Sequence, residues 1–173
     1  MTVVPRPARP TPLWIAATSE TTADLAAATG VPLLLGMHAP KGEIQALLQR
    51  YRALAGGGCL PHARAHLAYV ADTTGQARET LQASMPRWLA AAGAGIRIDG
   101  TPGPARDPAA YLRQLMAMHP VGDPDLCVQR LTDAITTTGI RHVLLMVEGA
   151  GDTAATVENI TRLGTEVIPR LAC

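Results

Sequence analysis

The chain has 173 residues, of which 47% are hydrophobic and 17% charged, a balance that supports one domain with a core and excludes an intrinsically disordered chain. Its 15 basic and 14 acidic side chains leave a formal net charge of +1, so it lacks the basic surface of a nucleic-acid-binding protein. No apolar run is long enough to cross a membrane, and three scattered cysteines, Cys59, Cys127 and Cys173, fit a reducing, cytoplasmic location and no disulfide scaffold.

A proline-rich segment opens the chain. Four prolines lie within residues 1–12, and this density predicts an extended lead-in without regular structure. Residues 13–173 then form the predicted domain. It starts with an apolar run at 13–17, which is typical of a strand buried on both faces. Ser19 is placed to cap a following helix that ends at Gly30.

The alternation of strand and helix continues through the middle of the chain. An apolar strand at 32–35 is followed by an amphipathic helix over 44–54, and a third strand is predicted at 66–71. Tyr51 and Trp88 both fall on the apolar stripe of a predicted helix, so we expect both aromatic rings to lie in the core.

The third helix and the residues after it carry signals that break regular structure. Asp72 or Thr73 can cap this helix, and Pro86 within its apolar pattern predicts a kink or a restart. Residues 93–108 are rich in glycine and proline and predict a mobile loop, which a shorter helix over 109–118 follows.

The last two helices flank a fourth strand. Asp123 followed by Pro124 is a strong helix start, and Gly139 marks the end of that helix. The apolar run at 142–147 predicts the fourth strand, and apolar residues spaced along 157–171 predict the face of the final helix.

Four strand–helix units in succession define the fold class as α/β with a parallel sheet. Two architectures fit this order: a small, open, doubly wound sheet, or four of the eight units of a TIM-type (β/α)8 barrel. A complete barrel needs roughly 250 residues, so this chain cannot close one alone. An open half barrel would expose two edge strands and an apolar inner face, and both require a partner.

In either architecture a ligand would bind at the carboxyl ends of the strands. The segment after the first strand is the most suggestive one. There Thr18, Ser19 and Thr22 place hydroxyl groups around the free N–H groups of a helix N-terminus, which suits a phosphate. The alternative interpretation is that Ser19 caps the helix and Thr22 has no ligand.

Other polar residues near the predicted strand ends are weaker candidates. His38 could act as an acid or base, although a solvated loop histidine is the commoner case. His62 and His66 have the spacing of a metal site on a helix, but the strand pattern there argues against one. Glu148 could bind a ligand or hydrogen-bond a neighbouring loop. The sequence contains no nucleotide-binding, nucleophile-elbow or zinc-protease motif.

Several segments, taken in order, resemble the second half of the luciferase-like flavin monooxygenases. The resemblance extends from about residue 4 to residue 171. Its motifs are residues 10–19, Thr21 with Thr22, 26–34, 119–124, 138–140 and 167–171. Because that family has a (β/α)8 barrel, the resemblance implies that this chain is a C-terminal half barrel of about four units.

The resemblance also implies a function. Members of the family use reduced FMN, or a deazaflavin in some branches, and commonly insert one oxygen atom from O2 into a small organic substrate. Their FMN phosphate lies partly at the turn after the fifth barrel strand, which corresponds here to Thr18, Ser19 and Thr22. A flavin reductase is the implied supplier of reduced flavin. The alternative is a non-catalytic flavin-binding or structural subunit that completes a partner's barrel.

The chain departs from the family because it lacks everything that corresponds to the first four strands. That half supplies much of the isoalloxazine pocket and a catalytic histidine region, so no catalytic residue is assigned here. Residues 36–38 also differ from the bulkier sequence that some luciferases carry. The missing half could come from a separate N-terminal chain, from a second copy in a homo-oligomer, or from the same gene if this is a truncated reading frame.

Overall fold

The computed structural model describes residues 11–56, 61–93 and 107–171. Its strands are β1 (Ile15–Ala17), β2 (Leu33–Leu35), β3 (Ala63–Leu67), β4 (Tyr69–Val70), β5 (Val121–Gly122) and β6 (His142–Met146). Its helices are α1 (Glu20–Thr29), α2 (Lys41–Leu54), α3 (Thr74–Gly93), α4 (Pro108–Met118), α5 (Pro124–Thr138) and α6 (Thr153–Arg162). After α6 come a π-helical segment, η1 (Leu163–Val167), and a 3-10 turn, η2 (Ile168–Arg170).

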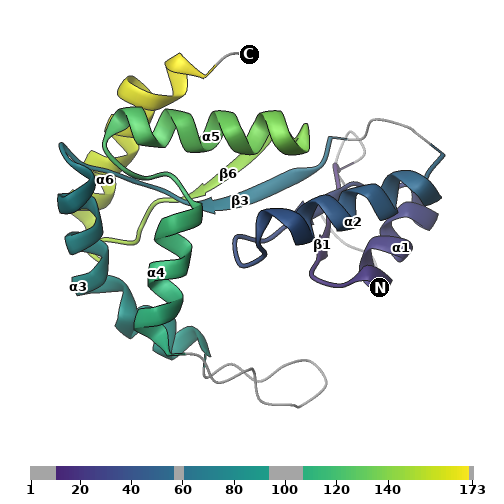
Figure 1. Ribbon diagram of the computed structural model, residues 1–173, viewed down its shortest axis with the longest axis horizontal. Coiled ribbons are helices and arrows are strands. Elements are labelled where there is room, and N and C mark those ends of the chain that lie inside the picture. The colour runs from purple at the N-terminus through teal and green to yellow at the C-terminus, as the bar shows by residue number, and fades with distance from the viewer. Residues whose placement is uncertain (1–10, 57–60, 94–106, 172–173) are drawn as a thin grey trace.

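Four strands form one parallel sheet in the order β1-β2-β3-β6, while β4 and β5 form a separate parallel pair. Figure 1 shows β3 and β6 of this sheet side by side. The sheet order is also the order along the chain, so every crossover moves in the same direction. A doubly wound sheet reverses direction at a switch point, and the observed order therefore rules that alternative out. Consecutive barrel strands have this order, which confirms the predicted partial barrel.

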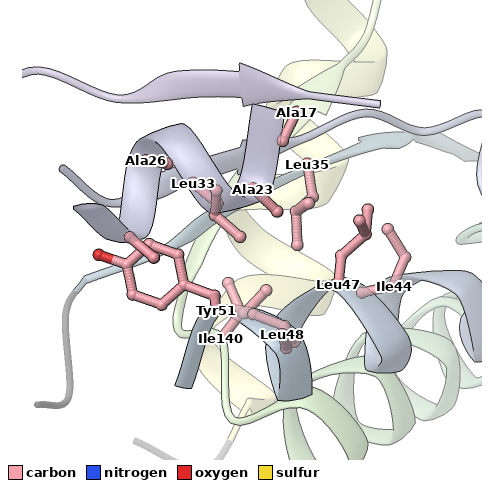
Figure 2. Close-up of a cluster of buried hydrophobic side chains, with 11 residues drawn as sticks. Ala17, Ala23, Ala26, Leu33, Leu35, Ile44, Leu47, Leu48, Tyr51 and Ile140 are labelled. Carbon is pink, nitrogen blue, oxygen red and sulfur yellow. The ribbon is translucent and has the colours of Figure 1, made fainter. Parts of the chain in front are cut away.

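Helices α1, α2 and α5 cover the same face of the sheet. Leu35 of β2, Arg64 of β3 and Val143 of β6 are register neighbours, so they point to the same side. Leu35 belongs to a cluster with residues of α1 and α2 (Figure 2), and Val143 packs against a cluster formed with α5 and η1. Tyr51 is fully buried in the first cluster and its hydroxyl donates to Val31 O at 3.1 Å, which confirms its predicted place in the core.

Among the described residues, the opposite face is covered toward the carboxyl ends of β3 and β6. There Leu67 and Met146 are register neighbours that pack against α3 and α4. Gly149, after β6, comes so close to α3 that an added Cβ would lie 2.9 Å from Leu81 Cδ2. Further toward the amino ends this face is open, and Leu144 of β6 is 45% exposed.

Trp14, which precedes β1, reaches across this open face. Its indole Nε1 donates to Pro61 O, just ahead of β3, at 2.8 Å. Its ring centroid lies 6.2 Å from that of His142 on β6. One side chain therefore connects the two outermost strands of the four-stranded sheet.

The ends of α1 and α5 follow local sequence signals. Ser19 and Asp123 cap the two helices through their side chains, and Pro124 occupies the first turn of α5. Gly30 and Gly139 end them at φ values of 66° and 73°, a left-handed conformation in which any other residue would be strained. These predicted boundaries are confirmed.

Helix α3 differs from the prediction in two respects. Of the two predicted caps Thr73 is used, since Gln76 N–H donates to its Oγ1 at 3.2 Å. A single helix runs through Pro86, so the restart, one of the two predicted alternatives, is wrong, and the kink stays a prediction. The buried stripe consists of residues spaced four apart: Ala77, Leu81, Met85 and Leu89. Trp88 lies beside this stripe and is 45% exposed, so its predicted place in the core is also wrong.

The third predicted strand is two strands in the structure. β3 begins at Ala63, ahead of the predicted start at residue 66, and ends at Leu67. Ala68 N–H donates to Met146 O, and the chain then leaves the sheet to pair with β5 as β4. The apolar pattern runs through this change of partner without a break, which is why the sequence suggested one strand.

The predicted apolar face of the last helix is partly exposed. Val157 and Ile160 on α6 are 57% and 51% exposed, whereas Leu163 and Val167 of η1 are buried in the cluster with α5. Residues 1–10 of the predicted lead-in at 1–12, and residues 94–106 of the predicted loop over 93–108, lie outside the described residues. At the two ends of that predicted loop, Gly93 belongs to α3 and Pro108 begins α4.

Candidate functional site

The carboxyl ends of β1 and β2 lie at one edge of the sheet and lead into the N-termini of α1 and α2. Thr18 and Ser19 follow β1, and His38 follows β2. An open surface hollow of about 610 Å³ lies beside α1 and α2 and is lined by residues that include Thr18, Ser19 and Arg50. The structure thus places the predicted phosphate-binding turn on a concave surface.

Ser19 and Thr22 are brought together as the helix-end prediction requires. Thr22 N–H donates to Ser19 Oγ at 3.3 Å, and the two hydroxyl oxygens lie 3.0 Å apart. Ser19 therefore caps α1, as the alternative interpretation expects. One hydroxyl donates to the other, which leaves a hydroxyl hydrogen that can still donate to a ligand.

Arg50 supplies a positive charge in the same hollow. Its guanidinium donates to Glu20 Oε2 at 2.8 Å and to Asp24 Oδ2 at 2.7 Å. The hydrogen bonds from Arg50 lower the pKa of Asp24 below its ordinary value, so this carboxylate stays charged. Glu43 of α2 is a further acid on the lining. An anion entering the hollow would therefore compete with carboxylates for Arg50.

The donors of this site fit a phosphate. The first turn of α1 offers backbone N–H groups and the positive end of the helix dipole, and Thr18 and Ser19 add exposed hydroxyls. The acidic neighbours Glu20 and Glu43 oppose an anion, and Arg50 offsets part of that charge. The backbone and hydroxyl groups are therefore the main contribution that this chain can make.

His38 has a defined partner at the neighbouring strand end. Its Nδ1 is hydrogen-bonded to the hydroxyl of Tyr111 on α4. The two residues line an open hollow of about 430 Å³ together with Glu43, Asp107 and Gln114. His38 is therefore part of a polar group at the carboxyl edge, where an acid or base could reach a ligand.

The other two histidines singled out from the sequence do not form a metal site. His62 Nδ1 accepts the N–H of Leu33 at 3.0 Å. His66 Nδ1 lies 3.1 Å from Nδ1 of His119, whose Nε2 lies 2.7 Å from Met37 O. Within the described ranges no group of histidine, cysteine and acidic side chains is arranged to hold a metal.

The buried pair of His66 and His119 was not predicted. Burial, with a smaller effect from its partner, lowers the pKa of His66 to about 3, and burial lowers that of His119 to about 4. Both rings are therefore neutral near pH 7 and tie β3 to the end of α4. The available signal was the alternation of His62, Arg64 and His66, which puts three polar side chains on one face of a buried strand.

Asn159 on α6 is a second residue that the sequence did not reveal. Its Oδ1 accepts the N–H of Val70 at 2.9 Å, and its Nδ2 donates to Ala68 O and Val147 O, both at 2.9 Å. These hydrogen bonds link β4 to the segment that follows β6. Glu148 accepts the N–H of the preceding residue, Val147, at 2.9 Å, and this bond tests neither the ligand-binding nor the loop-bonding interpretation of Glu148.

The described residues thus form a partial (β/α)8 barrel in which the first strand leads into the capped N-terminus of α1. The family model for luciferase-like monooxygenases matches residues 1–142, so the chain belongs to the luciferase-like monooxygenase family. No curated protein sequence matches it. In the part of the chain that the structure describes, no helix has the length and apolar character to cross a membrane.

Solved structures share the fold at low sequence identity. Monooxygenase RslO1 from Streptomyces bottropensis superposes with a TM-score of 0.68 and 21% identity, over 91% of this chain and 47% of its own. The oxygenating constituent of 3,6-diketocamphane monooxygenase from Pseudomonas putida, solved with FMN, gives 0.60 and 17%, over 88% and 46%. The riboflavin lyase RcaE, solved with modified FMN and riboflavin, gives 0.57 and 15%, over 89% and 41%. The chain spans less than half the length of these three structures.

Proposed function

We propose that this chain is a subunit or C-terminal portion of an FMN-dependent monooxygenase, which oxidises a small organic substrate with reduced flavin and O2. The turn after β1 carries the proposal, because it presents hydroxyl and N–H donors at the edge of the sheet where (β/α)8 enzymes bind ligands. Membership of the family supports it, as does the FMN in two of the similar structures.

In this proposal Thr18, Ser19 and Thr22 hold the flavin phosphate. Backbone N–H groups at the start of α1 and the hydroxyl groups would donate to the phosphate oxygens. Reduced flavin supplies the chemistry with O2 when it is bound, while the protein binds, orients and excludes water. A deazaflavin with the same phosphate would be held in the same way.

A comparison of FMN with riboflavin tests the proposal, because riboflavin lacks the phosphate. The wild-type chain should bind FMN more tightly than riboflavin. Ser19→Ala with Thr22→Ala should weaken FMN binding by roughly 10- to 100-fold, since hydrogen bonds to a charged group are worth about 1.5–3 kcal/mol. Riboflavin binding should not change. Thr29→Ala is the matched control, because its hydroxyl donates to Leu25 O at the far end of α1.

Two results would contradict this assignment. One is equal affinity of the wild-type chain for FMN and riboflavin. The other is a double variant that keeps the full preference for FMN while its circular dichroism matches that of the wild type. Titration followed by flavin fluorescence measures both affinities on the same sample.

The four-stranded sheet of the described residues favours a second candidate function, that of a non-catalytic flavin-binding or structural subunit. The sheet has four strands in the described residues, and the chain spans 47% of RslO1. Much of the pocket around a flavin ring would then come from elsewhere. Reoxidation of reduced FMN in air separates the two: a catalytic portion should change the rate on binding, and a structural subunit should leave it at the rate of free FMN.

The partner that we propose is a complementary N-terminal half-barrel chain or a second copy of this chain. β1 and β6 are the outer strands of the sheet, and the face that carries Leu144 and Trp14 is open. A flavin reductase would supply reduced flavin, and the cytoplasm is the proposed location. Light scattering during size-exclusion chromatography gives the mass of the particle, and a stable monomer would argue against self-association.

A further inference from the structure

Three basic residues point from β3 and its lead-in to the helix-covered face of the sheet. His62, Arg64 and His66 alternate along the chain and therefore lie on one side. Their exposed fractions are 7%, 5% and 2%. Strands of parallel sheets under helices normally carry apolar side chains at such positions, so each of these polar groups needs a partner.

Arg64 differs from its two neighbours in this respect. His62 and His66 have the hydrogen bonds described above, but the Nε of Arg64 is buried and has no hydrogen-bond partner within the described residues. The ion pairs found in the same residues do not include Arg64. Arginine does not lose its proton in proteins, so the charge remains, and an uncompensated buried charge is costly.

The groups around this guanidinium are basic as well. After burial, the pKa of His66 is lowered by the charges of His119 and Arg64. Apart from burial, the groups that lower the pKa of His119 are Arg64, His38 and Arg130 of α5. No carboxylate of the described residues is among these interactions. His66 and His119 are neutral near pH 7, so the charge of Arg64 is left without a carboxylate among these groups to balance it.

We propose that Arg64 is the centre of a buried anion site that binds a monovalent inorganic anion of about the size of chloride. The neighbours of Arg64 in register, Leu35 and Val143, have no side-chain group that could accept from the guanidinium. Helices α2 and α5 cover the face to which Arg64 points and contact each other, with Arg52 Nη2 donating to Thr138 O at 3.3 Å, so a small anion suits the position better than a phosphate ester. The site does not depend on the proposed flavin site.

Thermal unfolding of the full chain in chloride tests the proposal. Sodium chloride replaces sodium gluconate at constant ionic strength and pH 7.5, so general screening stays the same. We expect Tm to rise with chloride concentration, by about 5–10 °C at about 100 times Kd. Arg64→Met, which keeps an unbranched apolar stem and removes the charge, should remove the rise. Arg87→Met, at an exposed position of α3, should keep it.

Several outcomes would overturn the site. The first is a wild-type Tm that does not respond specifically to chloride, and the second is an equal rise in the Tm of Arg64→Met. The third is a Tm that rises with inorganic phosphate but not with chloride, which would point to the turn before α1. If Arg64→Met does not fold, wild-type crystals soaked in bromide give an independent readout. An anomalous peak within hydrogen-bond distance of the Arg64 guanidinium is expected, and its absence would refute the site.

Discussion

Mild acid should destabilise this chain through the buried pair of His66 and His119. The pKa values in the folded chain are about 3 and about 4, below the ordinary value of 6.5 that the unfolded chain should show. At a pH between the folded and the unfolded pKa of a histidine, the unfolded chain binds more protons than the folded chain. The free energy of unfolding therefore falls as pH falls below about 6.5. Each imidazole lowers the free energy of unfolding by about 1.4 kcal/mol per pH unit in this window, which amounts to about 2 kcal/mol at pH 5.

The two imidazoles together should therefore cost about 4 kcal/mol at pH 5, a large part of the 5–15 kcal/mol of a typical domain. The pKa of His62 is also lowered, chiefly by burial, and acts in the same direction. Asp24 and Glu166 have lowered pKa values, and their contributions are lost at more acidic pH, as pH falls below about 4.5. The window from pH 7.5 to 5 thus isolates the histidines.

Urea unfolding at pH 7.5, 6 and 5 measures this loss. His66→Gln with His119→Gln removes both titrating groups, and the amide at position 119 can still donate toward Met37 O. This double variant should lose most of the pH dependence, although it starts from lower stability. His142→Gln, exposed on β6, is the control and should keep the wild-type dependence. The reasoning is refuted if the double variant and the wild type lose the same free energy between pH 7.5 and 5.

Three further predictions concern packing and caps, and urea midpoints measure each of them. Asn159→Leu leaves two buried backbone groups and one partly buried backbone group without their partner and should cost about 3 kcal/mol, whereas Glu158→Ala beside it should change little. Gly149→Ala forces a methyl group against Leu81 and should cost about 1–3 kcal/mol, while Gly164→Ala, which meets nothing within 4 Å, should be neutral or stabilising by up to about 1 kcal/mol. Ser19→Ala removes the cap of α1 and should cost about 1 kcal/mol; no loss would mean that the cap contributes nothing.

The features that the sequence predicted well depend on short-range signals. The pair Asp123 and Pro124 places the start of α5, because a capping carboxylate and a proline at the first position satisfy local geometry. Gly30 and Gly139 mark helix ends for the same kind of reason. The alternation of strands and helices also predicted the parallel sheet, since parallel strands require crossovers.

The features that the sequence did not predict depend on contacts between distant segments. His119 lies 53 residues from His66, and Asn159 lies 89 residues from Val70. Contacts between residues so far apart produce no periodic pattern in the sequence. Trp88 was misplaced because apolar periodicity alone does not say how wide the buried stripe of a helix is. The turn at Thr18 and Ser19 could be located from the sequence, whereas its acidic surroundings could not.

The contact between Trp14 and His142 has a consequence for how the barrel shape arises. β1 and β6 are separated by two strands, so in a flat sheet they would lie roughly 14 Å apart, given about 4.8 Å between neighbours. Their flanking rings nevertheless come within 6.2 Å on the open face. A sheet that curls toward this face brings its outer strands closer together, and the distance agrees with such a curl. The indole ring of Trp14 thus links the two outer strands on the open face, and a partner that completes the barrel would meet a face on which this link is already present.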